Sequence, residues 1–381
     1  MPQALTRRTF GMLRAEPGMG RALALAIVCG AAVALPVFSV FASFWRGGAS
    51  ADTLQHLMAT VIPSALLETS LLGLAVVVGV VAVGAATGWL VATCEFLGRR
   101  TFEWALLLPL AMPAYIVAYA YTDYLQYAGP LQTALRDSFQ WQRGDYWFPE
   151  IRSLGGAAFV FIVVLYPYVY LLARTAFLAR TAAMMDAARS LGQTAWQTWW
   201  RVNLPLARPA IAAGALLALM ETLADYGAAS YFGLQTFTTS IYRAWFSLGD
   251  RLAASQLAAV LLVLVLMLFF IEHRVRGRAR FFTPTASQRP AARAQLRGRR
   301  SAGALALCAL PVALGFVIPV LLLLRLLGPA WQAVDWARYA RWLANTLSIG
   351  VAAALVALVV VLSLAYAARS TTRGAPNTLV R

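Results

Sequence analysis

Lysine is absent from this chain of 381 residues, and all 32 of its basic side chains are arginines. A P-loop needs a lysine on the nucleotide phosphates, and Schiff-base catalysis needs a lysine amine. The chain therefore cannot be a P-loop ATPase by itself, and any function driven by ATP must take its motor from another subunit. We accordingly expect it to bind no cofactor of its own.

Cysteine and histidine are nearly as scarce. Cys29, Cys94 and Cys308 lie far apart, each within or at the end of an apolar segment, and His56 and His273 are isolated. Cysteines in such positions pack as small apolar side chains, and this set is not that of a disulfide framework. We predict no catalytic residue and no metal site, so an integral-membrane enzyme or assembly factor is only a distant alternative.

Charged residues make up 12% of the chain and hydrophobic residues 61%, with a mean hydropathy of +0.68. Soluble domains carry about 25% charged residues, so the composition predicts an all-α polytopic membrane protein with about eight transmembrane helices. The first apolar run is too long for a cleaved signal peptide and has no clear cleavage site. The predicted spans are 22–44, 63–93, 104–124, 154–178, 210–232, 256–271, 301–324 and 343–368.

The arginines are distributed unevenly over the predicted loops. With a cytoplasmic amino terminus, 23 of the 32 fall on the cytoplasmic side, as the positive-inside rule expects. The net charge of +17 is thus explained by membrane orientation. We expect membrane lipid, and no nucleic acid, as a partner.

A polar, basic stretch at 184–209 separates two predicted spans on the cytoplasmic side. Its apolar residues at helical spacing predict two short helices, with Gly192 at the turn between them and Leu204-Pro205 closing the stretch before a new helix. The predicted apolar stripe consists of Met184, Ala188, Leu191 and Ala195.

Within this stretch, Asp186-Ala187-Ala188 is followed by Gly192 and, after nine more residues, by Val202-Asn203-Leu204-Pro205. In these residues and gaps it resembles the coupling loop of ABC importer permeases, whose pattern has glutamate where this chain has Asp186. The resemblance implies a type I ABC importer permease fold with a loop at 179–209 that docks on cytoplasmic ABC ATPase subunits. The alternative is an amphipathic connector that only re-enters the membrane. The predicted docking residues are Asp186, Ala187, Ala188, Gly192, Val202, Leu204 and Pro205.

The segment that follows, 219–245, resembles the corresponding part of fused two-half ferric iron permeases. This resemblance implies a bacterial inner-membrane permease that moves ferric iron delivered by an external, periplasmic binding protein, while a separate subunit hydrolyses ATP. Permeases for thiamine and for aminoethylphosphonate share the fused layout and are alternatives. Polyamine and sulfate permeases fit less well, because they are usually single-half chains.

Glu221 and Asp225 are carboxylates well inside a predicted apolar span, four residues apart and hence expected on one helix face. An acid within a membrane span is by default a functional-site hypothesis. Together with Tyr226 these residues could offer a ferric ion the hard oxygen ligands it prefers, along a translocation path that binds it weakly. The alternative is that the carboxylates pair with arginines or cap kinked backbone.

Residues 343–350 can be laid over 66–73, and each stretch opens a long Val/Ala-rich segment. The alternative is that any two such helices align. The repeat predicts a second half that stops early, so that the chain is a fragment or pairs with a second permease chain. The predicted domains are 1–61 (cytoplasmic amino terminus, anchor helix and external linker), 62–272 (transmembrane domain), 273–300 (arginine-rich cytoplasmic linker), 301–342 (anchor helix and linker of the second half) and 343–381 (start of an incomplete second domain).

Overall fold

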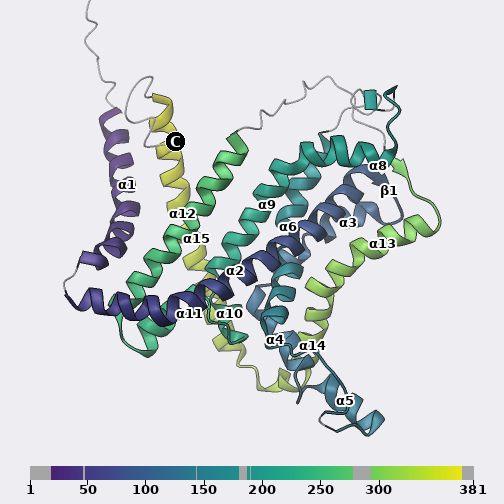
Figure 1. Cartoon of the computed structure of the whole chain (residues 1–381), viewed down its shortest axis with the longest axis horizontal. Coiled ribbons are helices and arrows are strands. Elements are labelled where there is room, and N and C mark those ends of the chain that lie inside the picture. The colour runs from purple at the N-terminus through teal and green to yellow at the C-terminus, as the bar shows by residue number, and fades with distance from the viewer. Residues whose placement is uncertain are drawn as a thin grey trace, which may run out of the picture. The chain divides into compact units, whose positions relative to one another are not determined.

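The computed structural model describes residues 19–45, 48–142, 144–179, 187–188, 190–277 and 293–370, and these are mostly helical (Figure 1). The chain forms two compact units. One consists of residues 43–329. The other combines residues 1–42 with 330–381, and its described helices are α1 (Met19–Phe41) and α15 (Trp336–Ser370), which pack on each other.

Seven helical segments of the described residues are long and apolar enough to cross a membrane, and an eighth is a bent pair. The pair joins Arg99–Ala111 to Ala114–Phe139 at an angle of 85°. Pro109 lies in the 3-10 turn η2 (Leu108–Ala111), and Pro113 precedes α4 (Ala114–Leu125). The all-α polytopic fold is confirmed. The bend lies at these two prolines, because neither can donate the backbone hydrogen bond that a continuous helix needs.

The core of the larger unit is formed by α2 (Gly48–Thr93), α6 (Leu154–Leu178) and α9 (Leu204–Ala224), which lie side by side (Figure 1). A Cβ added to Gly84 of α2 would lie 2.7 Å from the Val169 Cβ of α6, and one added to Gly214 of α9 would lie 2.6 Å from the Val169 Cα. Small residues let membrane helices approach this closely. The glycines of α2 and α9 therefore let both helices pack directly on the backbone of α6.

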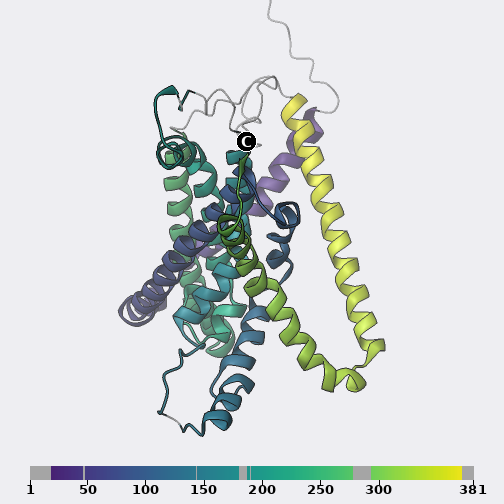
Figure 2. The ribbon, with the colours of Figure 1, turned by 90° about the vertical axis from the view of Figure 1, so that its right-hand side faces the viewer.

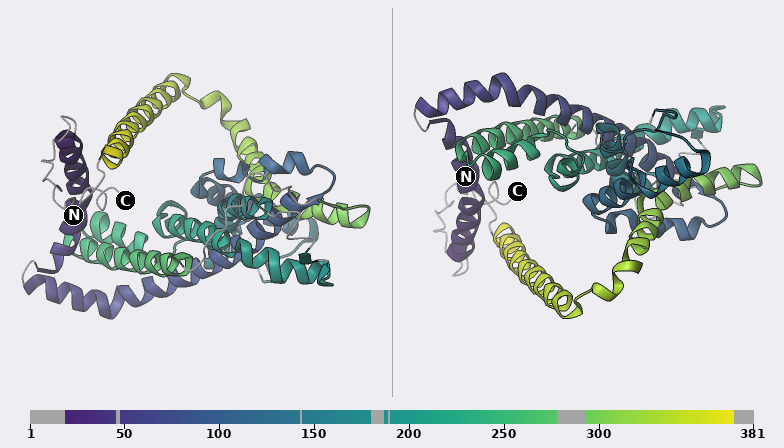
Figure 3. Two further views of the ribbon diagram at one scale, coloured as in Figure 1. Left: turned by 90° about the horizontal axis from the view of Figure 1, so that it is seen from above. Right: turned by 90° about the horizontal axis from the view of Figure 1, so that it is seen from below.

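Helix α2 begins earlier than the sequence suggested. Residues 48–62, predicted as part of a polar linker, are helical, and Leu57 among them is buried against Phe237 and Leu257. Burial of Leu57 beside α12 (Arg251–Gly277) holds residues 48–62 in the helix (Figure 3). At 1.5 Å per residue, 46 residues extend about 69 Å, more than twice the thickness of a bilayer core. Only part of α2 can therefore cross the membrane.

The elements that form the candidate sites lie at two ends of the larger unit (Figures 1 and 2). At the end that we name the coupling end, α8 (Ala195–Thr198) lies near β1 (Cys94–Glu95), α3 (Arg99–Ala105) follows β1, and β1 pairs in parallel with β2 (Ala294–Gln295). At the opposite end, which we name the pocket end, lie α5 (Pro130–Phe139), α10 (Gly227–Tyr231), α11 (Phe237–Tyr242) and the π turn η4 (Arg243–Ser247).

The predicted anchor of the second half packs on the core of the first. It consists of α13 (Arg299–Val312), the π turn η5 (Ala313–Val317) and α14 (Ile318–Ala330). The Tyr121 hydroxyl of α4 donates to the Leu314 carbonyl at 2.6 Å, and a Cβ on Gly315 would lie 2.9 Å from Pro109. Within each compact unit, therefore, a helix from one predicted half packs with helices of the other.

Candidate coupling segment and pocket

The described part of the predicted coupling loop, which we name the coupling segment, comprises residues 187–188 and 190–203. Its first helical turn ends at Gly192, which has a φ of +72°. The Gln193 N–H donates to the Ala188 carbonyl at 3.1 Å, and the Leu191 N–H donates to the Ala187 carbonyl at 3.1 Å. These bonds and the left-handed glycine are typical of a Schellman turn. The predicted turn at Gly192 is confirmed.

A second helix starts directly after this turn. The Gln197 N–H donates to the Thr194 hydroxyl at 3.3 Å, and the Thr194 N–H donates to the Gln197 side-chain oxygen at 3.0 Å. This reciprocal pair is a capping box. The helix runs through α8 and the π turn η3 (Trp199–Asn203) into α9 without a break, so the expected closure at Leu204-Pro205 is wrong. Pro205 has no N–H to donate, and it follows directly on the π turn, where the Leu204 N–H still bonds the carbonyl five residues back and the bonding pattern of the helix changes.

The predicted docking residues divide into a packed set and an exposed set. Ala188 is buried, whereas Ala187 and Gly192 are exposed, and among the described residues beyond its chain neighbours no atom would lie within 4 Å of a Cβ on Gly192. Leu191 is 79% exposed, so the predicted stripe does not continue through it, because the turn that ends the helix turns this side chain away. Asp186 and Met184 lie outside the described residues. Val202, Leu204 and Pro205 are half-buried.

An aromatic contact fixes the coupling segment to the body of the protein. The ring of Trp199 lies edge-on to that of Trp89 near the end of α2, with centroids 6.2 Å apart at 77°. Trp200 packs edge-on against Trp199 at 4.6 Å and is itself 47% exposed. The segment thus rests on α2, while the side chains of Leu191 and Trp200 remain exposed.

A charge cluster at the coupling end joins α3 to α6. Buried Arg99 contacts Glu95 at 3.0 Å and also hydrogen-bonds Glu103, while Arg174 on the last turns of α6 approaches Glu103 at 3.4 Å. Arg293, next to β2, lies 3.8 Å from Glu95. Because α6 leads into the predicted coupling loop, this cluster sets the position from which that loop starts.

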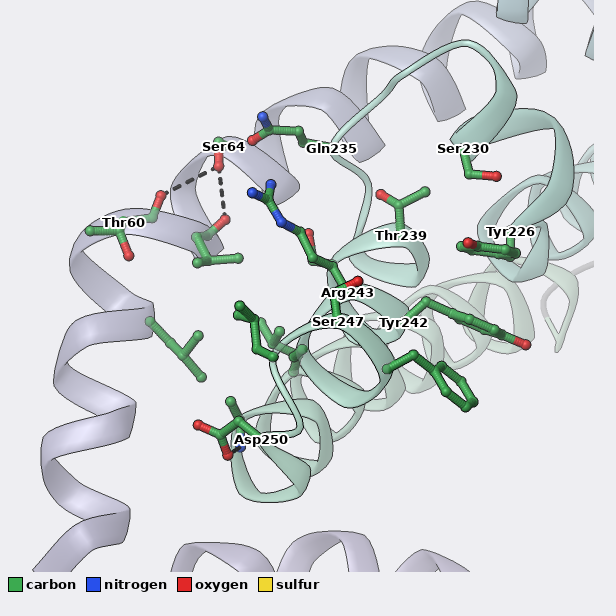
Figure 4. Close-up of a pocket in the computed structure, with 18 of the residues that line it drawn as sticks. Thr60, Ser64, Tyr226, Ser230, Gln235, Thr239, Tyr242, Arg243, Ser247 and Asp250 are labelled. Carbon is green, nitrogen blue, oxygen red and sulfur yellow. Dashed lines mark hydrogen bonds between the residues drawn. The ribbon is translucent and has the colours of Figure 1, made fainter.

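At the pocket end, a cavity of about 840 Å³ lies between the first third of α2, α11, η4 and the start of α12 (Figure 4). Its base is an apolar cluster around Leu57, Phe237 and Leu257. Its walls carry hydroxyl, amide and guanidinium groups. The polar lining includes Thr60, Ser64, Tyr226, Ser230, Gln235, Thr239, Tyr242, Arg243, Ser247 and Asp250.

The loop above the pocket is fixed to α2 by an acid that the sequence analysis overlooked. Glu68 accepts the Gln235 N–H at 2.6 Å, and the Thr69 hydroxyl accepts the Phe237 N–H at 3.2 Å. Glu68 lies within the candidate span Gln55–Thr93. An acid in so apolar a run was the available signal, by the same reasoning that singled out Glu221.

The three residues predicted for the translocation path have different surroundings. Helix α9 ends at Ala224, and Asp225 is its C-cap, with an N–H that still donates to the Glu221 carbonyl at 3.0 Å and an extended ψ that turns the chain out of the helix. The Asp225 carboxylate accepts the N–H groups of Ala228 at 2.7 Å and Ala229 at 3.3 Å. Asp225 therefore caps α10, which was the alternative considered for it.

Burial raises the pKa of the Asp225 carboxyl, and the two N–H donors oppose that rise. Glu221 is exposed on α9. Tyr226 lines the pocket, where its ring stacks on that of Tyr242 with centroids 3.9 Å apart. The structure thus brings Tyr226, but not Glu221 or Asp225, into the pocket lining.

Residues 84–276 match the model of a family described as "Binding-protein-dependent transport system inner membrane component". An Fe(3+)-transport system permease protein of Haemophilus influenzae is 25% identical over 213 residues, a match that covers 56% of this chain but only 38% of that protein. A putative molybdenum transport system permease protein of Bacillus subtilis is 27% identical over 208 residues, covering 52% of this chain and 88% of that protein.

A crystal structure of a bacterial alginate ABC transporter, in complex with an alginate-bound periplasmic protein, is similar in fold. The TM-score is 0.52 at 19% identity, and the similarity covers 67% of this chain and 94% of that chain. This likeness supports the type I ABC importer permease fold alone.

Proposed function

Because the chain belongs to the family of binding-protein-dependent transport system inner membrane components, we propose that it is the transmembrane permease subunit of an ABC importer. Members of this family are transport components and not enzymes. In the proposal, separate cytoplasmic ATPase subunits hydrolyse ATP, and a periplasmic binding protein delivers the solute. The amino terminus and the coupling end face the cytoplasm, and the pocket end faces outward.

The observation that carries the proposal is the turn at Gly192. The residues that match the family model include this turn, and its φ of +72° favours glycine. The exposed side chain of Leu191 lies next to it. A turn fixed by a Schellman motif and a capping box presents a rigid surface, and preorganised surfaces bind partners with less loss of conformational entropy. Docking of an ATPase subunit on this surface would move α2 and α9, which adjoin it.

For the solute we propose ferric iron, supported by the similarity to the Haemophilus influenzae iron permease. Thiamine and aminoethylphosphonate are alternative solutes, because their permeases share the fused two-half layout. The similarity to a molybdenum transport permease adds molybdate, an oxyanion, to these candidate solutes. A second permease chain that completes the translocation path belongs to the same proposal.

The function is tested by uptake of labelled ferric iron, molybdate and thiamine into cells that lack the gene and into complemented cells. The proposal predicts that one of these uptakes depends on the gene and on ATP, with iron expected. Loss of thiamine or molybdate uptake with iron unchanged would replace the solute and keep the permease. Unchanged uptake of all three, in cells where the chain is inserted and its partners are present, would count against the transport role for these solutes.

A further inference from the structure

We propose that the pocket binds an oxygen-rich anion through the guanidinium of Arg243. The solute would be a free oxyanion or a ferric ion enclosed in carboxylate ligands. This inference rests on the proposed function for its link to transport, and it names the class of solute that the pocket end recognises.

Arg243 supplies the charge. It is the first residue of η4, and its side chain extends into the pocket toward Ser64 and Gln235 (Figure 4). Within the part of the chain that the structure describes, no ion pair or side-chain hydrogen bond engages its guanidinium. A guanidinium presents five N–H donors in a planar fork that matches carboxylates and other oxyanions.

The acidic groups around the pocket are already engaged by backbone donors. Asp250 accepts the Ala253 N–H at 2.9 Å and so caps α12, and it lies well away from the Arg243 guanidinium (Figure 4). Glu68, outside the lining, accepts the Gln235 N–H at 2.6 Å. His56 also lines the pocket. Of the aspartate and the arginine in the described lining, the arginine is therefore the one whose charged group has no hydrogen-bond or ion-pair partner.

A neutral donor lies beside this charge. The side chain of Gln235 lies near the Arg243 guanidinium (Figure 4), and it makes none of the side-chain hydrogen bonds found among the described residues. In contrast, the hydroxyls of Thr60 and Ser64 donate to carbonyls of their own helix. A free amide beside a guanidinium forms a set of donors suited to an anion.

The volume of the pocket agrees with a small solute. Small-molecule sites measure about 300–1,000 Å³, and this cavity has about 840 Å³. A bare cation beside an unpaired guanidinium would be repelled. A ferric ion surrounded by carboxylates presents anionic oxygens instead, and so does a tetrahedral oxyanion.

The test measures protection of a cysteine from an impermeant maleimide, using the full chain in nanodiscs where both faces are open to solvent. Thr60→Cys places the thiol in the pocket lining at an exposed position. Cys29 is replaced by Ala, while Cys94 and Cys308 are buried. Ser138→Cys on α5, exposed and outside the pocket, reports effects of salt alone. The probes are molybdate, sulfate, ferric citrate, citrate alone, and thiamine as a cation.

Arg243→Gln is compared with Arg251→Gln, which removes a nearby positive charge that lies over Trp245 outside the pocket lining. Loss of a charge-assisted contact should raise the half-protecting anion concentration about tenfold or more for Arg243→Gln and less than about twofold for Arg251→Gln. Arg243→Lys should recover part of the loss, because it restores the charge but not the fork.

Protection of Thr60→Cys by molybdate or sulfate supports the free oxyanion, and protection by ferric citrate but not by citrate alone supports the chelated ion. The inference is overturned if no anion protects, if thiamine protects equally, or if Arg243→Gln leaves protection unchanged. The protection assay needs no ATPase, so the proposed pocket and the proposed transport function can fail independently of each other. Protection without gene-dependent uptake would refute the transport role, whereas uptake without protection would refute this site.

Discussion

The docking role of the coupling segment is best tested by two substitutions at Gly192 that carry the same backbone strain. A left-handed conformation costs a residue with a Cβ about 1–2 kcal/mol. No atom lies within 4 Å of the Cβ position, so neither Gly192→Ala nor Gly192→Arg meets a clash at that atom. The two variants differ chiefly in the long charged side chain that arginine projects from an exposed turn.

If the turn is only a connector, both variants should behave alike. If an ATPase subunit docks on it, Gly192→Ala should weaken binding by no more than roughly fivefold to thirtyfold, the equivalent of that strain. Gly192→Arg should weaken it at least about tenfold further, because a buried, unpaired charge at an interface costs several kcal/mol. The assay is binding of the purified chain to the ATPase subunit that copurifies with the wild type, paired with ATP-dependent uptake. Equal losses for Ala and Arg would refute the docking surface.

Three further predictions concern packing. Gly84→Val should lower the melting temperature of the purified chain, because the added Cβ would overlap α6, and the free energy of unfolding should fall by about 1–3 kcal/mol or more. The control is Gly303→Val, whose Cβ meets nothing within 4 Å and which should change the melting temperature little. Trp199→Ala should reduce ATP-dependent uptake through loss of its aromatic contact with α2, worth about 0.5–1.5 kcal/mol beyond burial; equal uptake by Trp199→Ala and Trp200→Ala would argue against a special role for that contact. Tyr121→Phe removes a hydrogen bond to η5 and should destabilise the chain by about 1 kcal/mol, measured by thermal unfolding.

Features set by local chemistry were predictable from the sequence. Long apolar runs identified the membrane helices, since the bilayer imposes their length. A lone glycine after a helical pattern identified the turn at Gly192, because few other residues adopt its backbone conformation without strain. The bend at Pro109 and Pro113 is also of local origin, since proline lacks the donor that a continuous helix needs.

Features that depend on tertiary contacts were not predictable. Arg243 and Ser64 come from distant segments of the chain, and neither is distinctive in its local sequence. The helical spacing of Glu221 and Asp225 suggested an acid pair, but it carried no sign that α9 ends between them. Glu68 was visible as an acid in an apolar run, yet its bond to Gln235 appears only when the loop is placed.

Helix α2 physically connects the two candidate sites. Near one end Trp89 holds Trp199 of the coupling segment, and near the other Thr60 and Ser64 form a wall of the pocket. Between them α2 packs directly on the backbone of α6 at Gly84, and because interiors packed this closely transmit strain, we expect the two helices to shift together. A displacement at the coupling segment therefore reaches the pocket through a continuous helix. By linkage, if docking of an ATPase subunit changes the affinity of the pocket for its anion by some factor, the bound anion must change the affinity for the ATPase subunit by the same factor.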